Sequence, residues 1–317
     1  MNLDLLFENL TNPALLFFLL GILAVILKSD LEIPPNSSKF ISLYLLFSIG
    51  FKGGQELAHT SFDMQIVWCI LFAVLMAIII PIYTFFILRC KFNIYDSGAI
   101  AAAYGSVSAV TFVTAISFLE MQNIPYNGYM VAVMALMEAP AIIVGVFLVQ
   151  FFNPKKNSIH IFGMIKHSFT NGSVLLIIGS LLIGFLASEK QALGIKPFTT
   201  DLFKGFLAIF LLDMGISSGR KIKSLISSGW FVFLFAIMVP LFNGVLVAYF
   251  SKYICDEIGN RLLISILAAS ASYIAVPAAV KIAIPKANSG LFLPMALAIT
   301  FPINITIGLP IFYLIID

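Results

Sequence analysis

Charged side chains are scarce in this chain of 317 residues, and their scarcity excludes whole classes of protein. Only 10% of the residues are charged and 61% are hydrophobic, whereas soluble domains are about 25% charged and about 45–50% apolar. A soluble fold needs a polar surface that this composition cannot supply. The composition therefore predicts a membrane protein whose main partner is the lipid bilayer, and the form of its apolar runs, described below, predicts an all-α fold.

The chain is also poor in the residues that metal centres and catalytic sites require. Its three cysteines, Cys69, Cys90 and Cys255, match no zinc or redox spacing, so we expect free packing thiols and no transition-metal site. Three histidines fall in predicted loops, and no nucleophile with a base, paired carboxylates or phosphate-binding glycine loop accompanies them. These absences argue against an enzyme. A net charge of +3 is likewise too small to predict a nucleic-acid partner.

Long hydrophobic runs take the place of the missing charges. A bilayer core of about 30 Å needs about 20 helical residues, and a lipid-exposed backbone must satisfy its own hydrogen bonds. Barrel strands would alternate apolar and polar residues, which these runs do not. The runs therefore predict about ten transmembrane helices. They lie at residues 13–28, 39–51, 65–88, 96–118, 129–152, 172–187, 201–215, 228–250, 261–282 and 290–315; we expect the second and seventh to be short, each ending in a Gly/Ser stretch.

Features of the first five segments recur in the same order in the last five. The recurring features are a Thr-Asn pair, a glycine-rich end, a proline, a serine-rich break and a Met-Ala-Leu triplet: Thr11 and Thr170, Gly50 and Gly215, Pro81 and Pro240, Ser106 and Ser270, Met134 and Met295. Because five is odd, the second copy must enter from the opposite face. We therefore predict two inverted five-helix repeats, residues 1–152 and 172–317, joined by a short cytoplasmic connection at 153–171.

The distribution of Lys and Arg predicts the orientation. Of the 18 basic residues, twelve belong to the side reached after segments one, three, five, seven and nine, and six to the other side. The side with twelve basic residues should be cytoplasmic. We therefore expect a multi-pass protein of the cell inner membrane with both termini on the outer side. The start of the chain carries Asp4 and Glu8 and no basic residue, so a cleavable signal peptide is not expected.

Two helices contain polar interruptions at matching positions, and these are the candidate binding site. They are Gly105-Ser-Val-Ser-Ala-Val-Thr111 in segment four and Ala268-Ala-Ser-Ala-Ser-Tyr-Ile-Ala-Val-Pro277 in segment nine. Inverted-repeat transporters bind substrate where such broken helices meet, since half-helix N-termini offer N–H groups and a positive dipole end to an anion. Tight packing of small residues is the alternative. The candidate substrate-binding residues are Ser106, Ser108, Ala109, Thr111, Ser270, Ser272, Ala275 and Val276.

Glu138 is the candidate charged residue of the membrane interior. It lies ten residues into segment five, and burying a charge in lipid costs at least about 2.5–3.5 kcal/mol. It could bind a cation, carry a proton or pair with a basic residue. A cation would use Glu138 with the oxygens of Ser108, Thr111 and Ser272.

Other charges fall near segment ends, where simpler explanations exist. We expect Lys52 and Lys281 to extend their ammonium groups to the interface. Asp213 lies beside the glycine-rich end of segment seven, and either a functional or an interfacial position is compatible with its location.

The whole chain resembles the sodium-dependent bicarbonate transporters best represented in cyanobacteria. The stretches that carry the resemblance are Ile49-Gly-Phe-Lys-Gly-Gly54, Gly105-Ser-Val-Ser-Ala-Val-Thr111, Leu119-Glu120, Ile124-Pro-Tyr126, Glu138-Ala-Pro140, Met214-Gly215, Ala268-Ala-Ser-Ala-Ser272, Ile284-Pro-Lys-Ala-Asn288 and Pro302 to Phe312. The resemblance implies two inverted repeats with broken helices four and nine crossing. It also implies a core domain that moves against a gate domain of segments one, two, six and seven, a homotrimer, and import of bicarbonate with sodium.

Two departures from the family pattern affect the expected substrate. Val110 replaces a hydroxyl residue of the first break, and Tyr273 stands where the cyanobacterial pattern has an Asp. The connection between the halves is also shorter, which weakens the expectation of a cytoplasmic regulator. The leading hypothesis is a secondary transporter of a small anion, bicarbonate by resemblance, coupled to sodium and needing no cofactor. The alternatives are a carrier of the same fold for another small anion or organic acid, a proton-coupled carrier, and, less favoured, a channel or membrane enzyme.

Overall fold

The computed structural model describes residues 11–59, 63–152, 172–226 and 229–317. Within these ranges every regular element is a helix. Six helical stretches among them are long and apolar enough to cross a membrane, and three shorter apolar helices accompany them. The six stretches are Met64–Arg89, Ile94–Met121, Tyr129–Phe151, Glu189–Ile222, Trp230–Ser251 and Gly290–Ile316. The chain is therefore a multi-pass helical membrane protein, as the composition predicts.

The first half of the chain forms helices whose starts are set by short polar caps. Its elements are α2 (Pro13–Ile26), α3 (Pro35–His59), α4 (Met64–Arg89), α5 (Ile94–Gly105), α6 (Ala109–Met121) and α7 (Tyr129–Phe151). Asn12, Asp63, Asn93 and Ser108 each accept a hydrogen bond from a backbone N–H of the helix that follows. Such side chains satisfy donors that the first helical turn leaves free. The polar residues between the apolar runs thus fix where each helix begins.

The second half repeats this series with shorter pieces near its end. Its elements are α9 (Gly172–Leu186), α10 (Glu189–Lys196), the π-helical η1 (Pro197–Asp201), α11 (Phe203–Ile226), α12 (Trp230–Ser251), α13 (Ile258–Ala269), α14 (Ala275–Ala283), α15 (Ser289–Met295), η2 (Ala296–Thr300), α16 (Phe301–Ile303), η3 (Asn304–Gly308) and α17 (Leu309–Ile316). The π turns of the last span accompany Pro294, Pro302 and Pro310, each of which removes a helical hydrogen bond. The surface helix α10 has no counterpart among the predicted segments.

The expectation that segments two and seven are short is wrong. Helices α3 and α11 are 25 and 24 residues long and continue through their glycines. Each glycine lies where two helices touch: a Cβ on Gly54 of α3 would be 2.1 Å from the Leu181 carbonyl oxygen of α9, and one on Gly215 of α11 would be 2.0 Å from the Phe18 oxygen of α2. The glycines are therefore sites of close backbone approach and not helix ends.

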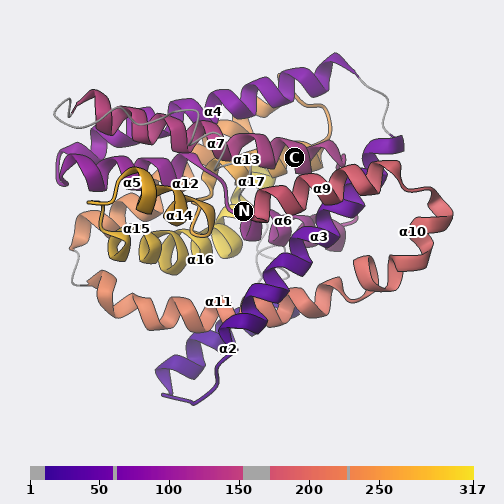
Figure 1. Ribbon diagram of the computed structural model, residues 1–317, viewed down its shortest axis with the longest axis horizontal. Helices are drawn as coiled ribbons and strands as arrows, with labels where there is room; N and C mark the ends of the chain where they lie inside the picture. The colour runs from indigo at the N-terminus through magenta and orange to yellow at the C-terminus, as the bar shows by residue number, and fades with distance from the viewer. Residues whose placement is uncertain (1–10, 60–62, 153–171, 227–228) are drawn as a thin grey trace.

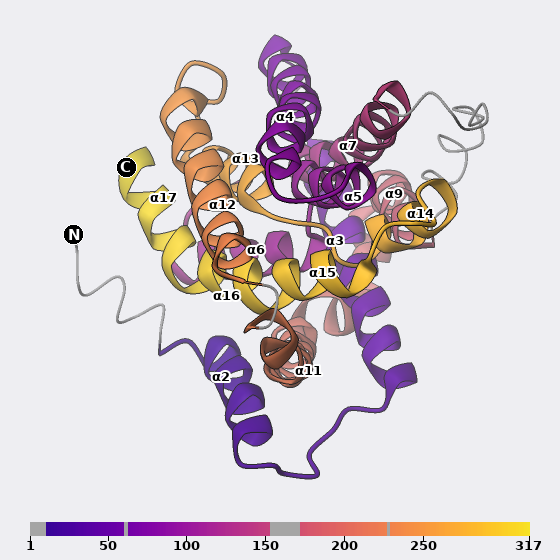
Figure 2. The same ribbon diagram turned by 90° about the vertical axis from the view of Figure 1, so that its left-hand side faces the viewer.

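The helices fall into two groups in space. Helix α2 packs along α11 and α3 packs along α9, whereas α4 packs against α5 and α7, and α12 against α13 and α17. In Figure 2, α2 and α11 lie below, and α4, α7, α12 and α13 lie above. Figure 1 shows the same separation, with α10 at the edge of the lower group. We call α2, α3, α9, α10 and α11 the lower group and the remaining helices the upper group.

Hydrogen bonds between the halves define the two ends of the helix bundle. Asn127, between α6 and α7, receives and donates hydrogen bonds with Asn260 at the start of α13, at 2.6 and 2.8 Å. At the other end, the Asn288 N–H donates to Asp96 at 2.7 Å. Since the spans are antiparallel, these loops mark opposite ends, which we call the Asn127 face and the Asp96 face. The ends of α3 and α6 and the start of α4 lie at the Asn127 face.

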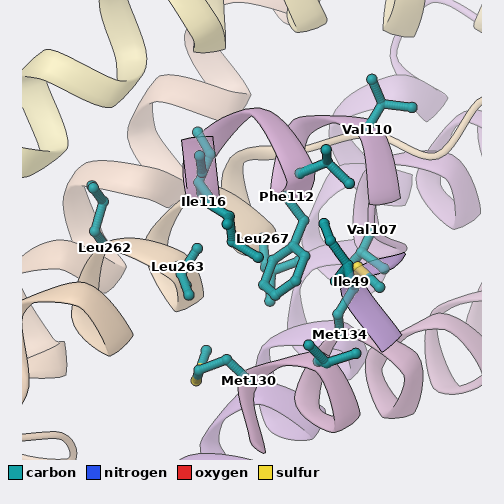
Figure 3. Close-up of a cluster of buried hydrophobic side chains, with 14 of the residues drawn as sticks. Ile49, Val107, Val110, Phe112, Ile116, Met130, Met134, Leu262, Leu263 and Leu267 are labelled. Carbon is teal, nitrogen blue, oxygen red and sulfur yellow. The ribbon is translucent and has the colours of Figure 1, made fainter. Parts of the chain in front are cut away.

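The hydrophobic core surrounds α6 and α13. Phe112 and Ile116 of α6 are buried together with Leu263 and Leu267 of α13 and Met134 of α7. Figure 3 shows these side chains directed toward one another from the three helices. This packing holds the inner ends of α6 and α13 in register, which positions the interruptions described next.

Candidate functional site

The first interruption separates α5 from α6. Helix α5 ends at Gly105, where a Cβ would lie 2.4 Å from Cδ of Pro81 on α4. Ser106 is extended (φ −83°, ψ 175°), and α6 begins after Ser108, whose Oγ accepts a hydrogen bond from the Thr111 N–H at 3.2 Å. Glycine followed by capping serines thus ends one helix and starts another within a single apolar run.

The second interruption separates α13 from α14 and starts with the same backbone geometry. Ser270 follows the last residue of α13 with φ −82° and ψ 167°, close to the values of Ser106. The chain becomes helical again at Ala275, and Pro277 is then the third residue of α14. A proline in the first helical turn removes no intrahelical hydrogen bond. Pro277 therefore fits the start of a helix and does not itself break one.

The two interruptions cross in contact. The Ser108 N–H donates to Ser270 Oγ at 2.9 Å, and the Ser272 N–H donates to the Ala103 carbonyl at 2.8 Å. The Asn304 amide of η3 donates to the Ala269 carbonyl at 2.7 Å. Backbone groups that helix ends leave unpaired are thereby satisfied across the crossing. These bonds fix the two half-helix starts relative to each other.

A small cavity lies beside the crossing, between the upper group and helices α3 and α9. Its volume is about 40 Å³, and because one water needs about 10–15 Å³ on this measure, it has room for a few waters or a very small solute. Its lining comes from both interruptions and from α3, α7 and α9. The lining residues are Leu46, Val107, Ser108, Ala109, Met134, Ala135, Glu138, Ser173, Val174, Ile177, Ser272, Tyr273, Ile274 and Ala275.

Glu138 of α7 is the charged member of this lining. It is half-buried, and no described residue forms a hydrogen bond or an ion pair with it. The α6 and α14 N-termini present first-turn N–H groups and the positive ends of their dipoles to the same region. The cavity thus combines a carboxylate, suited to a cation, with helix N-termini, suited to an anion.

The structure brings some of the predicted site residues together at the cavity and places others behind it. Ser108, Ala109, Ser272, Ala275 and Glu138 line the cavity. The remaining candidates, which are buried outside the lining, are Ser106, Thr111, Ser270 and Val276. The Ser270 hydroxyl is fully used in the crossing, since it accepts from Ser108 and donates to the Leu267 carbonyl at 2.8 Å.

Tyr273 and Ser173 are lining residues that the sequence reasoning did not select. The Tyr273 hydroxyl is buried and interacts with Ser108, but no atom of the described chain is aligned to form a regular hydrogen bond with it. A tyrosine in an apolar run is usually a packing residue, and Ser173 belongs to neither interruption. The sequence marks position 273 only as a departure from the family's Asp, and no local pattern marks Ser173 as part of a binding site.

A wider cavity adjoins the small one on the side of the Asp96 face. Its volume is about 480 Å³, and it shares Ser173, Tyr273 and Ile274 with the small cavity. We call it the vestibule. Its polar lining includes Lys39, Arg220 and Lys221, besides Ser38, which donates a hydrogen bond to Asp213. Asp213 is buried and faces this vestibule rather than lipid. Arg220 pairs with Glu32 at 3.5 Å, so the lining charges beyond this pair are Lys39, Lys221 and Asp213, and their positive excess favours an anion there.

An ion pair joins the two groups of helices near the Asn127 face. Lys52 of α3 binds Glu120 of α6, which joins the lower group to the upper group. The sequence-based expectation for Lys52 does not include this partner, which lies 68 residues away along the chain. A cavity of about 440 Å³ beside the pair has no lining residue in common with the small cavity. Burial, and then the carboxylates of Glu120 and Glu56, raise the pKa of the neighbouring Tyr126, so its hydroxyl stays neutral.

Some predicted features lie outside the described part of the chain. They are the Lys281 side chain and the connection at 153–171.

Comparison with known families gives one match, which spans nearly the whole chain. The family model described as the Na⁺-dependent bicarbonate transporter superfamily matches residues 13–317. No curated protein matches the chain.

Proposed function

The chain belongs to the Na⁺-dependent bicarbonate transporter superfamily, and we propose that it is a secondary active transporter that imports bicarbonate together with sodium. Membership makes it a membrane permease and not an enzyme. The observation that carries the proposal is the crossing of two helix interruptions beside a cavity that contains Glu138. Inverted-repeat transporters bind both substrate and coupling ion in such a place.

We propose that the fold consists of ten spans in two inverted repeats, residues 1–152 and 172–317, joined by residues 153–171. In this scheme α2, α3, α4, α5–α6 and α7 correspond to α9, α11, α12, α13–α14 and α15–α17. The packing supports it, because α2 against α11 and α3 against α9 are equivalent pairs, as are α4 against α5 and α12 against α13. The nearly equal dihedral angles of Ser106 and Ser270 support it too.

In the proposed mechanism sodium and anion occupy the small cavity together. Sodium, a hard cation, binds the Glu138 carboxylate with hydroxyl and carbonyl oxygens. Bicarbonate binds the first N–H groups of α6 and α14 and the hydroxyls of Ser108 and Ser272. Without sodium, the Glu138 charge would repel the anion in a site of low polarity. Coupling then follows from charge compensation, since neither ion binds well alone.

Alternating access would come from movement of the lower group against the upper group. The vestibule leads from the cavity to the Asp96 face, whereas Lys52 and Glu120 join the two groups at the Asn127 face. With the Lys/Arg orientation, the Asp96 face is cytoplasmic, both termini are outside the inner membrane, and this conformation is inward-facing. A homotrimer is proposed on the family resemblance alone.

A proton-coupled carrier of another small anion is the second candidate. Tyr273 occupies the position of the family's Asp, so Glu138 remains as the carboxylate of the described cavity lining. A single carboxylate can carry one proton instead of one sodium ion. The small volume of the cavity favours a solute of bicarbonate size over a larger organic acid.

Uptake of labelled bicarbonate into proteoliposomes tests the proposal. Sodium should raise uptake by about 5- to 150-fold, the usual range of coupling between two sites. In Glu138→Gln, which keeps the shape but not the charge, the ratio with and without sodium should fall to about one. The matched control, Glu257→Gln, removes an exposed carboxylate at the Asn127 face and should keep the full ratio. Uptake that follows a proton gradient and ignores sodium would favour the second candidate instead.

A further inference from the structure

Two of the three cysteines meet in the structure although 186 residues separate them. The sulfur atoms of Cys69 and Cys255 are 2.8 Å apart, and both side chains are completely buried. Cys69 lies in the second turn of α4, and Cys255 lies in the loop between α12 and α13. No other atom fits between the two sulfurs. The third cysteine, Cys90, is exposed.

The surroundings of the pair hold both backbones in place. The Cys255 N–H donates to the Ser251 carbonyl at 2.8 Å, which fixes the loop to the end of α12. Gln65, one turn before Cys69 on α4, donates a hydrogen bond to Asp256. The contact therefore results from anchored segments on both sides and not from one flexible side chain.

We propose that Cys69 and Cys255 form a disulfide bond in the mature protein. The sulfur atoms of a disulfide lie about 2.05 Å apart, so a shift of less than about 1 Å closes the bond. Each thiol gives up one proton and one electron, and the single new bond joins the two sulfurs. An oxidant that itself contains a disulfide accepts both electrons and both protons and is reduced to a dithiol.

The location of the pair suits such a bond. It lies near the Asn127 face, where the neighbouring Asn127 and Asn260 are hydrogen-bonded, and this face is outside in the Lys/Arg orientation. Disulfides form and persist in oxidising compartments outside the cytoplasm. Because both thiols are buried in the folded protein, the bond would form while the helices assemble, before the oxidant loses access to them. This inference depends on the orientation but not on the substrate or the coupling ion.

The bond would link the first half of the chain to the second inside the upper group. Helices α4 and α13 both belong to that group, so the bond leaves the movement between the groups free. A disulfide that closes a long loop restricts the unfolded chain strongly. The expected role is therefore stabilisation of the upper group without loss of transport.

Counting free thiols tests the inference directly. A Cys90→Ser variant is produced in a bacterium that inserts it into its inner membrane. The purified protein is then denatured without reductant, and a maleimide reagent labels every free thiol. We expect no labelled thiol per chain before reduction and two after it, measured by intact mass. Two labelled thiols before reduction would overturn the inference.

A second measurement guards against an indirect result. Cys69→Ser in the same background should show one free thiol with or without reductant. Reductant should lower the unfolding temperature of Cys90→Ser by several degrees, since a disulfide contributes about 2–4 kcal/mol, and should leave that of the double variant unchanged. An equal response of both proteins to reductant would contradict the bond.

Discussion

At the scale of single residues, Ser270 shows how a candidate ligand can have a structural task. Its hydroxyl accepts from the Ser108 N–H and donates to the Leu267 carbonyl, so it joins the two interruptions, and it is not part of the lining of the small cavity. A serine in a broken helix is a reasonable candidate for substrate binding. Only the crossing partner, 162 residues away, reveals the other role.

Replacing Ser270 by Ala should therefore reduce stability more than substrate affinity. The Ser108 N–H would lose its partner in a buried place, at a cost of about 1–3 kcal/mol. Ser180→Ala is the matched control, because Ser180 is also buried but forms no hydrogen bond with a described residue. Unfolding temperatures in detergent measure the difference. Equal temperatures for the two variants would show that the crossing bond contributes nothing.

Residue pairs explain most of what the sequence could not predict about the site. The position of Glu138 in a span and the serines of both interruptions could be read from local patterns. The pairing of Lys52 with Glu120 joins residues 68 positions apart, and the lining role of Tyr273 depends on how the second interruption crosses the first. Such features arise from tertiary packing, which no local pattern contains.

At the scale of elements, the glycines of α3, α9 and α11 set how closely helices approach. Glycine and serine next to a polar stretch usually end a helix, and the sequence was interpreted in that way for segments two and seven. The same residues also permit close packing in membranes. The interruptions of segments four and nine, predicted from their serine-rich stretches and from Pro277, are present in the structure, where Ser108 caps α6 and Pro277 lies in the first turn of α14.

Two glycines of helix α9 allow the packing role to be tested, because one of them contacts another helix and the other does not. Gly184 touches α3, and a Cβ there would lie 2.1 Å from the Phe51 carbonyl oxygen, whereas nothing lies within 4 Å of a Cβ on Gly179. Gly184→Ala should force the helices apart and lower the yield and unfolding temperature of the protein. Gly179→Ala should be neutral or gain up to about 1 kcal/mol from helix propensity. The interpretation of Gly184 as a contact site fails if both substitutions behave alike.

At the scale of the whole molecule, the two larger cavities indicate from which face of the protein the small cavity is accessible. The vestibule, on the side of the Asp96 face, shares lining residues with the small cavity, and the cavity beside Lys52 does not. The charge distribution along the sequence assigns the Asp96 face to the cytoplasm, and the structure alone does not. The two lines of reasoning together predict which side of the membrane reaches the site.

Two variants with one introduced cysteine each, one just before α11 and the other within it, can test which side of the membrane reaches each cavity. Ser217 lines the vestibule, and Thr200 lines the cavity at the Asn127 face. In a Cys90→Ser background, a membrane-impermeant maleimide should label Ser217→Cys from the cytoplasmic side and Thr200→Cys from the outside. Inverted and right-side-out vesicles provide the two sides. Because α11 joins the two positions, labelling of both from one side contradicts the proposed spanning of α11, and exchanged sides reverse the orientation.

If transport proceeds by movement between the groups, sodium with bicarbonate should also slow the labelling of Ser217→Cys, because an occupied and closing site narrows the vestibule.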